Sequence, residues 1–143
     1  MNPRSKAREF TVQAVYQWIM TEHEAKEIEE QFIAEHDMQS ADFPYFQELL
    51  HEVVLHKLSL VDLMIDELDR PFDQIDPVEQ AILLLSCYEL QSKPDIPYRV
   101  AINEGVELAK TFGAEDGYKF INGILDKVAL KLRAEEIAAR NKK

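Results

Sequence analysis

The sequence is poor in glycine and cysteine, and it has no apolar run long enough to cross a membrane. Its 143 residues include only four glycines and one cysteine. A single cysteine cannot form a disulfide within the chain, so a reducing, cytoplasmic location is expected. The longest apolar run, residues 81–85, falls far short of the roughly 20 residues that a membrane span needs. The basic N-terminal segment is not followed by an apolar block, so we expect no signal peptide.

Catalytic and metal-binding motifs are also missing. The sequence contains no glycine-rich phosphate loop and no nucleophile elbow. His51 and His56 are separated by a spacing that places them about 140° apart around a helix, so they cannot face one metal ion. Cys87 lies in the most apolar segment, where a buried thiol is more usual than a nucleophile. We therefore expect neither an enzyme nor a metal or cofactor site.

Apolar residues recur with the period of an α-helix along nearly the whole chain, which predicts an all-α fold. Residues 1–143 should form a single domain of about seven helices, with residues 134–143 as a tail that frays. The clearest helix start is Asp76, which is followed by proline and glutamate at positions favoured in a first turn. The helix that begins there is apolar nearly all round, so it should be central and buried. Thr21 and Glu24 predict a capping box for a second helix.

The net charge of −11 is divided unevenly along the chain. Residues 9–92 hold 3 basic and 19 acidic residues, whereas residues 1–8 and 93–143 together hold 13 basic and 8 acidic residues. If the two basic ends meet in space, they form a basic patch on an acidic body. The alternative is that these charges only keep the chain ends solvated.

Phe120 falls about 100° from the core stripe of the last helix, at the edge of its outward flank. Lys119, Lys127 and Gly123 lie on the same flank. Aromatic rings beside cations suit single-stranded RNA, because bases stack on the ring and phosphates pair with the ammonium groups. The alternative is that Phe120 packs on a neighbouring helix and that Gly123 permits its close approach.

Three segments resemble the NusB family of bacterial transcription antitermination factors. They are RSKAREFTVQAVYQW (4–18), DPVEQAILLLSCYEL (76–90) and PYRVAINEGVELAKTFGAEDGYKFINGILDKVA (97–129). The resemblance implies a NusB-like fold of two packed helical bundles, without a cofactor. It also implies a cytoplasmic protein that binds boxA RNA of ribosomal RNA leaders. NusE, a ribosomal protein of the small subunit, would be its partner within an RNA polymerase antitermination complex, and no membrane would be involved.

The resemblance also assigns roles to residues of this chain. The RNA-binding positions that it implies are Arg4, Lys6, Arg8, Tyr16, Asp116, Lys119 and Phe120. Glu79 matches a position expected to face the protein partner. The sequence departs from the family pattern in two places: Ser5 interrupts the basic run, and Gly105 replaces a common alanine, which should loosen that helix slightly.

One alternative function remains open from the sequence, a methyltransferase is excluded, and the oligomeric state is not determined. The chain would otherwise be an RNA-binding or protein-interaction module of ribosomal RNA processing without boxA specificity. A NusB-like domain also precedes the catalytic domain of some ribosomal RNA methyltransferases, but no nucleotide-binding glycine motif is present here. A homodimer would be an additional state, and it would cover part of the surface that faces RNA.

Overall fold

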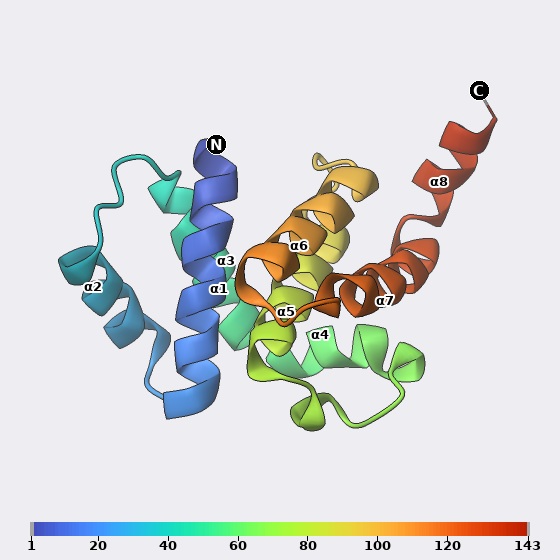
Figure 1. Cartoon of the computed structure of the whole chain (residues 1–143). Helices are drawn as coiled ribbons and strands as arrows, with labels where there is room; N and C mark the ends of the chain where they lie inside the picture. The colour runs from blue at the N-terminus through green and yellow to red at the C-terminus, as the bar shows by residue number, and fades with distance from the viewer. Residues whose placement is uncertain (1, 143) are drawn as a thin grey trace.

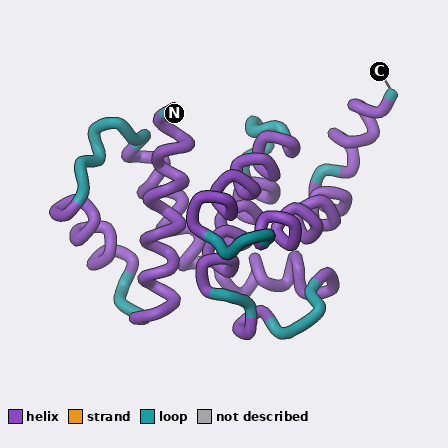
Figure 2. The backbone as a smooth tube through the Cα atoms, viewed as in Figure 1, coloured by secondary structure: helices purple, strands orange, loops and turns teal. Residues whose placement is uncertain are grey.

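The computed structural model describes residues 2–142, and these residues form helices and connecting turns without a strand (Figures 1 and 2). The α-helices are α1 (Pro3–Thr21), α2 (Ala25–Glu35), α3 (Phe43–Leu55), α4 (Lys57–Met64), α5 (Pro77–Ser92), α6 (Tyr98–Phe112), α7 (Gly117–Leu132) and α8 (Ala134–Asn141). Two short 3-10 helices, η1 (Ile65–Glu67) and η2 (Phe72–Gln74), lie between α4 and α5. The all-α prediction is confirmed, with one helix more than the seven or so expected.

The helices pack as two groups around α5, as Figure 1 shows. Helices α1, α2 and α3 contact one another, and α4, α6 and α7 pack on the remaining sides of α5. Every residue from Glu79 to Leu90 is buried, so the prediction of a central buried helix is confirmed. None of the helices within residues 2–142 is both long and apolar enough to span a membrane.

Side chains that precede the helices explain where two of them begin. Asp76 accepts hydrogen bonds from the backbone nitrogens of Val78 and Glu79 at 2.9 and 3.4 Å, which satisfies two otherwise unpaired donors. Asp42 does the same for Tyr45 at the start of α3. Pro77 opens α5, at a position where its missing N–H costs nothing. The predicted start of the central helix is confirmed.

The capping box predicted at Thr21 is wrong. Helix α1 continues through Thr21, whose hydroxyl donates to the carbonyl of Gln17 within the same helix. The helix ends at Glu22, which adopts a left-handed conformation with φ of 59°. Helix α2 then begins at Ala25, and Glu24 precedes it without a capping side-chain bond.

The C-terminal tail that was expected to fray is helical through Asn141, and Lys143 lies outside the described residues. Arg133, just before α8, is only 7% exposed. Its guanidinium donates to Glu136 and to the backbone carbonyls of Glu89, Leu90, Lys93 and Ile96. Glu136 also accepts from the backbone nitrogen of Tyr98 at 2.8 Å. One arginine therefore binds four carbonyls at the end of α5 and in the turn that follows it, and it fixes the first turn of α8.

Gly105 marks the closest approach of α6 to α5. A Cβ atom added there would lie 2.6 Å from Ser86 Oγ and 3.0 Å from Leu125 Cδ1. The glycine is therefore required by packing, and it does more than loosen the helix as the sequence suggested. Ser86 Oγ is buried and has no hydrogen-bond partner among the described residues, so this hydroxyl occupies the space that a methyl group would need.

We predict that Gly105→Ala lowers the free energy of unfolding by about 1–3 kcal/mol through overpacking, although alanine favours a helix by about 1 kcal/mol over glycine. In a Ser86→Ala background the same substitution should cost clearly less, because the nearest clashing atom is gone. Urea unfolding of the wild type, the two single variants and the double variant tests the prediction. Equal costs in the two backgrounds would show that Ser86 is not the obstacle.

Candidate nucleic-acid interface

The cations expected on α1 divide between two faces of the helix. Arg4 and Arg8 lie about 40° apart around the helix axis and point toward α3, α5 and α6. Lys6 and Tyr16 lie about 80° apart on the outward side. Tyr16 is 38% exposed, as its position opposite the apolar stripes suggested. The four residues therefore do not form one continuous patch.

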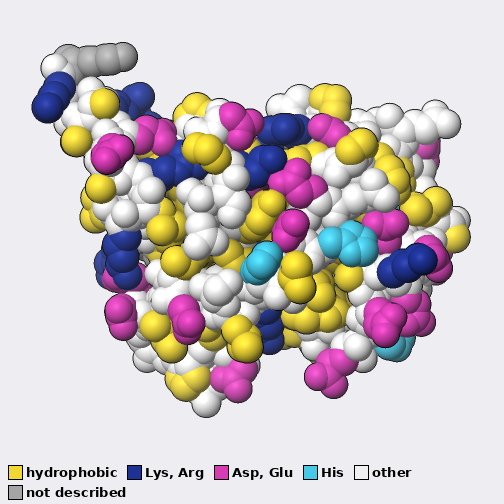
Figure 3. All heavy atoms as spheres, turned by 180° about the vertical axis from the view of Figure 1, so that it is seen from behind, with side chains coloured by type: hydrophobic (Ala, Val, Ile, Leu, Met, Phe, Trp, Pro, Cys, Tyr) yellow, Lys and Arg dark blue, Asp and Glu magenta, His cyan; other side chains and the backbone are white. Residues whose placement is uncertain are grey.

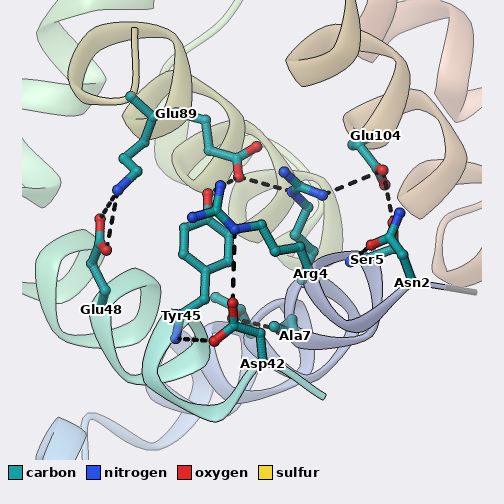
Figure 4. A network of polar contacts seen from close by, with 12 residues as sticks. Asn2, Arg4, Ser5, Ala7, Asp42, Tyr45, Glu48, Glu89 and Glu104 are labelled. Carbon is teal, nitrogen blue, oxygen red and sulfur yellow. Dashed lines mark hydrogen bonds and ion pairs between the residues drawn. The ribbon is translucent and has the colours of Figure 1, made fainter. Parts of the chain in front are cut away.

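Arg8 is buried, which corrects the expectation that it lies on the RNA-facing surface. The whole residue is only 3% exposed, and its Nε donates to Glu89 Oε2 at 2.8 Å. Nη1 lies 3.3 Å from Glu104 Oε1. The Tyr45 hydroxyl donates to the same oxygen of Glu89 (Figure 4). Two carboxylates already hold the guanidinium, so it is not available to a phosphate in this arrangement.

Burial has the largest effect on the pKa of both acidic groups in this cluster, Glu89 and Tyr45. It raises the pKa of Glu89, and the opposite effects of Arg8 and of the Tyr45 hydrogen bond only partly offset it. Burial and the adjacent Glu89 carboxylate also raise the pKa of Tyr45, so its hydroxyl stays a donor. Glu89 Oε1 has no hydrogen-bond partner within the described part of the chain. The carboxylate therefore depends on Arg8 to remain charged.

Arg4 and Ser5 complete the N-terminal side of this cluster (Figure 4). The Arg4 guanidinium lies 4.3 Å from the centre of the Tyr45 ring and 3.8 Å from carboxylate oxygens of Asp42 and Asp95. Its side chain remains 41% exposed. Ser5 Oγ donates to Glu104 Oε1 at 2.8 Å, so the serine that interrupts the basic run links α1 to α6. No local sequence signal indicated that role.

Lys119 and Phe120 lie on the flank of α7 that the helical angles predicted. The Lys119 side chain is 67% exposed and its Nζ lies 3.4 Å from Asp116 Oδ1. Phe120 is half-buried. A Cβ atom added at Gly123 would meet nothing within 4 Å, so no helix packs there. The alternative is therefore wrong for Gly123, which permits no close helix contact, although Phe120 does pack partly against the hydrophobic core.

Arg70 is a neighbour of Phe120 that the sequence did not indicate. Its guanidinium carbon lies 4.9 Å from the centre of the Phe120 ring, within the range of a cation–π contact. Arg70 comes from the segment between η1 and η2 and also pairs with Asp69. Phe120 therefore has a cation over its ring from Arg70, whereas Lys119 Nζ lies 5.9 Å from the centre of the Tyr118 ring.

Glu79, the expected partner-facing residue, is 8% exposed. A Cβ atom at Gly117 would lie 2.5 Å from Glu79 Oε2, so this glycine makes room for the carboxylate at the start of α7. Burial and the nearby Asp76 raise the pKa of Glu79, and Arg70 partly opposes them. Most of the side chain is covered by the protein itself, which leaves little of it for a partner to contact.

An apolar groove lies beside Glu79, and we call it the Tyr16 groove. It has a volume of about 430 Å³. Helix α1 forms one wall, and the start of α5 and the end of α6 form the other. Its lining residues are Val12, Gln13, Tyr16, Gln17, Met20, Thr21, Phe32, Val78 and Phe112. Met20 is 57% exposed, so the groove presents apolar surface to solvent.

Comparison with known proteins decides the family. The model of the NusB family matches residues 5–130. This chain belongs to the NusB family. The transcription antitermination protein NusB of Pseudomonas entomophila is 47% identical over 139 residues, which cover 97% of this chain and 84% of that protein. The protein of the same name from Actinobacillus succinogenes is 52% identical over 130 residues, or 90% and 91% of the two chains.

A solved structure of NusB from T. maritima agrees with the fold. It is 28% identical and superposes with a TM-score of 0.78, covering 89% of this chain and 90% of the other. Helix α8 lies beyond the residues that the NusB family model matches. The cluster around Arg8 apart from Arg4, the surroundings of Phe120 and the Tyr16 groove all lie within them.

We predict that Arg8→Ala lowers the free energy of unfolding by about 3–5 kcal/mol at neutral pH, because it leaves Glu89 buried without its countercharge. The pKa of Glu89, already raised in the folded state, then rises further. Between the ordinary glutamate pKa and this raised pKa, Glu89 is protonated in the folded variant but ionised in the unfolded chain. The free energy of unfolding of the variant therefore falls as the pH rises through this range. The loss relative to wild type should therefore shrink at acid pH.

Urea unfolding across this pH range measures the effect. Arg4→Ala is the matched control, because the exposed Arg4 should contribute only about 0–1 kcal/mol. A similar, pH-independent loss for both variants would contradict the structural role of Arg8.

Proposed function

We propose that this chain is a cytoplasmic, non-enzymatic transcription antitermination factor. It binds boxA RNA of ribosomal RNA leaders together with NusE, within an RNA polymerase antitermination complex. The open flank of α7 carries the proposal: Lys119 is exposed, Phe120 is half-buried, and no other element covers Gly123. The names of the related proteins support the antitermination role.

The chemistry of this flank suits an unstacked nucleotide. A base can stack against the accessible part of the Phe120 ring, and Lys119 can pair with its phosphate. Gly123 leaves backbone exposed, so a sugar or phosphate can approach the helix closely. Asp116 lies 3.4 Å from Lys119 and restrains that cation until RNA replaces it. Arg4 and Lys6, both partly exposed, would contact the RNA from α1.

The charge distribution supports the need for a protein partner. Residues 9–92 contain 19 acidic and 3 basic residues, which favours association with a basic ribosomal protein. The Tyr16 groove offers apolar surface within this section. Because Arg8 is held inside the protein, the cations available to RNA on α1 are fewer than the sequence suggests. We therefore expect the chain alone to bind boxA RNA weakly and the complex with NusE to bind it more tightly.

Phe120→Ala and Lys119→Ala should each weaken binding of boxA RNA to the NusE complex. Loss of base stacking costs about 1–3 kcal/mol per base. Loss of one phosphate contact reduces the steepness of the plot of log affinity against log salt concentration by about 0.7. Fluorescence anisotropy with labelled RNA at several salt concentrations measures both effects.

Lys26→Ala on the exposed side of α2 is the control for net charge, and thermal melts exclude misfolding. Unchanged RNA affinity in folded Phe120→Ala would refute the stacking role. Equal affinity for boxA and for unrelated single-stranded RNA would favour the module of ribosomal RNA processing without boxA specificity.

We propose that the Tyr16 groove binds the protein partner, so that Tyr16 contacts NusE in place of the RNA contact that the resemblance implied for it. Tyr16→Ala should weaken NusE binding by about 2 kcal/mol or more if the ring is a central contact. Calorimetric titration with NusE measures this loss. RNA binding at saturating NusE should change little, whereas a direct RNA contact would reduce it even then. Sedimentation of the chain alone shows whether it forms a homodimer, and dimer loss in Tyr16→Ala would place the groove in that interface.

A further inference from the structure

We propose that a groove between α6, α7 and α8 binds a further stretch of single-stranded RNA, next to the segment held by α1 and α7. This inference rests on the proposed RNA-binding function and extends it to a new site. We call the site the α6–α8 groove; its volume is about 770 Å³. The residues that carry the argument are Tyr98, Arg99, Asn103, Asn122, Asp126 and Arg140.

The arginines of this chain divide into two kinds. Arg4, Arg8, Arg70 and Arg133 each lie within ion-pair distance of a carboxylate. Arg99 and Arg140 are exposed, and neither pairs with a carboxylate within residues 2–142. Both line the α6–α8 groove. In a chain with a net charge of −11, the two guanidinium groups without a carboxylate partner therefore face one hollow, where they can bind phosphates.

The other lining residues suit bases better than a second protein chain. Asn103 on α6 and Asn122 on α7 are exposed, and their amides can donate to and accept from base edges. Asp126 would repel a phosphate, but its carboxylate can accept from the amino group of a base. Tyr98 is half-buried at the groove wall and offers part of an aromatic ring for stacking. Asp126 disfavours an acidic peptide as it disfavours a phosphate, whereas the exposed part of the Tyr98 ring favours a ligand that carries a planar base.

The groove is continuous with the basic N-terminal end of α1. A neighbouring hollow lined by Arg4 and Ile96 shares Val100 and Glu104 with it. Glu104 is already bound to Arg8 and Ser5, so its charge is partly neutralised at this junction. Figure 3 shows Lys and Arg side chains gathered mainly in the upper part of the face opposite that of Figure 1. An RNA strand that passes Arg4 can therefore continue into the α6–α8 groove.

Helix α8 is held firmly enough to form one wall of the site. Arg133 and Glu136 tie its first turn to the end of α5 and the start of α6. Arg140 follows two turns later on the same helix. The match to the NusB family model ends at residue 130, so this wall lies outside the matched part of the chain. The proposed site is thus an addition to the surface on α1 and α7.

The test uses the full chain in complex with NusE and two kinds of RNA: boxA alone, and boxA with an unstructured single-stranded tail of mixed sequence at one end or the other. One of the tails should tighten binding by wild type. Arg99→Ala/Arg140→Ala should abolish that gain, on the order of tenfold, and leave binding of boxA alone unchanged. For the tailed RNA, the slope of log affinity against log salt concentration should become shallower by about 1.4, which is about 0.7 for each lost phosphate contact.

Lys26→Ala/Lys57→Ala is the matched control, because it removes the same charge from elements that do not line the groove. If boxA alone fails to bind, the proposed function is wrong. If boxA binds and neither tail adds affinity, or if both double variants lose the gain equally, the α6–α8 groove is not an RNA site and the proposed function is unaffected. The inference would also be overturned if the α6–α8 groove bound an acidic peptide and the RNA tail added no affinity.

Discussion

The ion pair between Arg8 and Glu89 is the contact on which the arrangement of the helices depends. Helix α5 is buried along most of its length, so a carboxylate on it must find its partners inside the protein. Glu89 receives Arg8 from α1 and Tyr45 from α3, and Arg8 also reaches Glu104 on α6. Glu89 therefore joins α1 and α3 to α5, and Arg8 extends this connection to α6 in the other helical group. Apolar packing is not directional, so without this ion pair one helix could slide along another more easily.

The sequence predicted those features that depend on residues close together in the chain. Asp76 and Asp42 cap the helices that follow them because each reaches backbone nitrogens two or three residues ahead. The burial of Arg8 could not be predicted in this way, since its partner Glu89 lies 81 residues away. The role of Arg133 was equally hidden. Its main acceptors are backbone carbonyls, and these carry no signal in a sequence.

The candidate site shows the same division between local and distant information. Helical angles placed Lys119 and Phe120 on the outward flank of α7, and the open space beside Gly123 agrees with them. The cation over the Phe120 ring comes from Arg70, in a loop whose path the angles do not describe. Tyr16 was predicted to face outward from α1. The groove beside it required Val78 and Phe112 from other elements, so only the tertiary structure could reveal it.

Under the proposed function, the placement of charges would let an acidic protein take part in RNA binding without holding RNA tightly by itself. Arg8, Arg70 and Arg133 are occupied by the protein's own carboxylates and stabilise the fold or restrain a neighbouring ring, whereas the side chain of Arg4 stays 41% exposed. Lys119 and the pair Arg99 and Arg140 lie on different elements, and each place supplies only one or two cations. Electrostatic attraction from so few contacts is weak, and it adds up only along a strand that spans them. A partner that contributes further cations would therefore decide when the RNA is held.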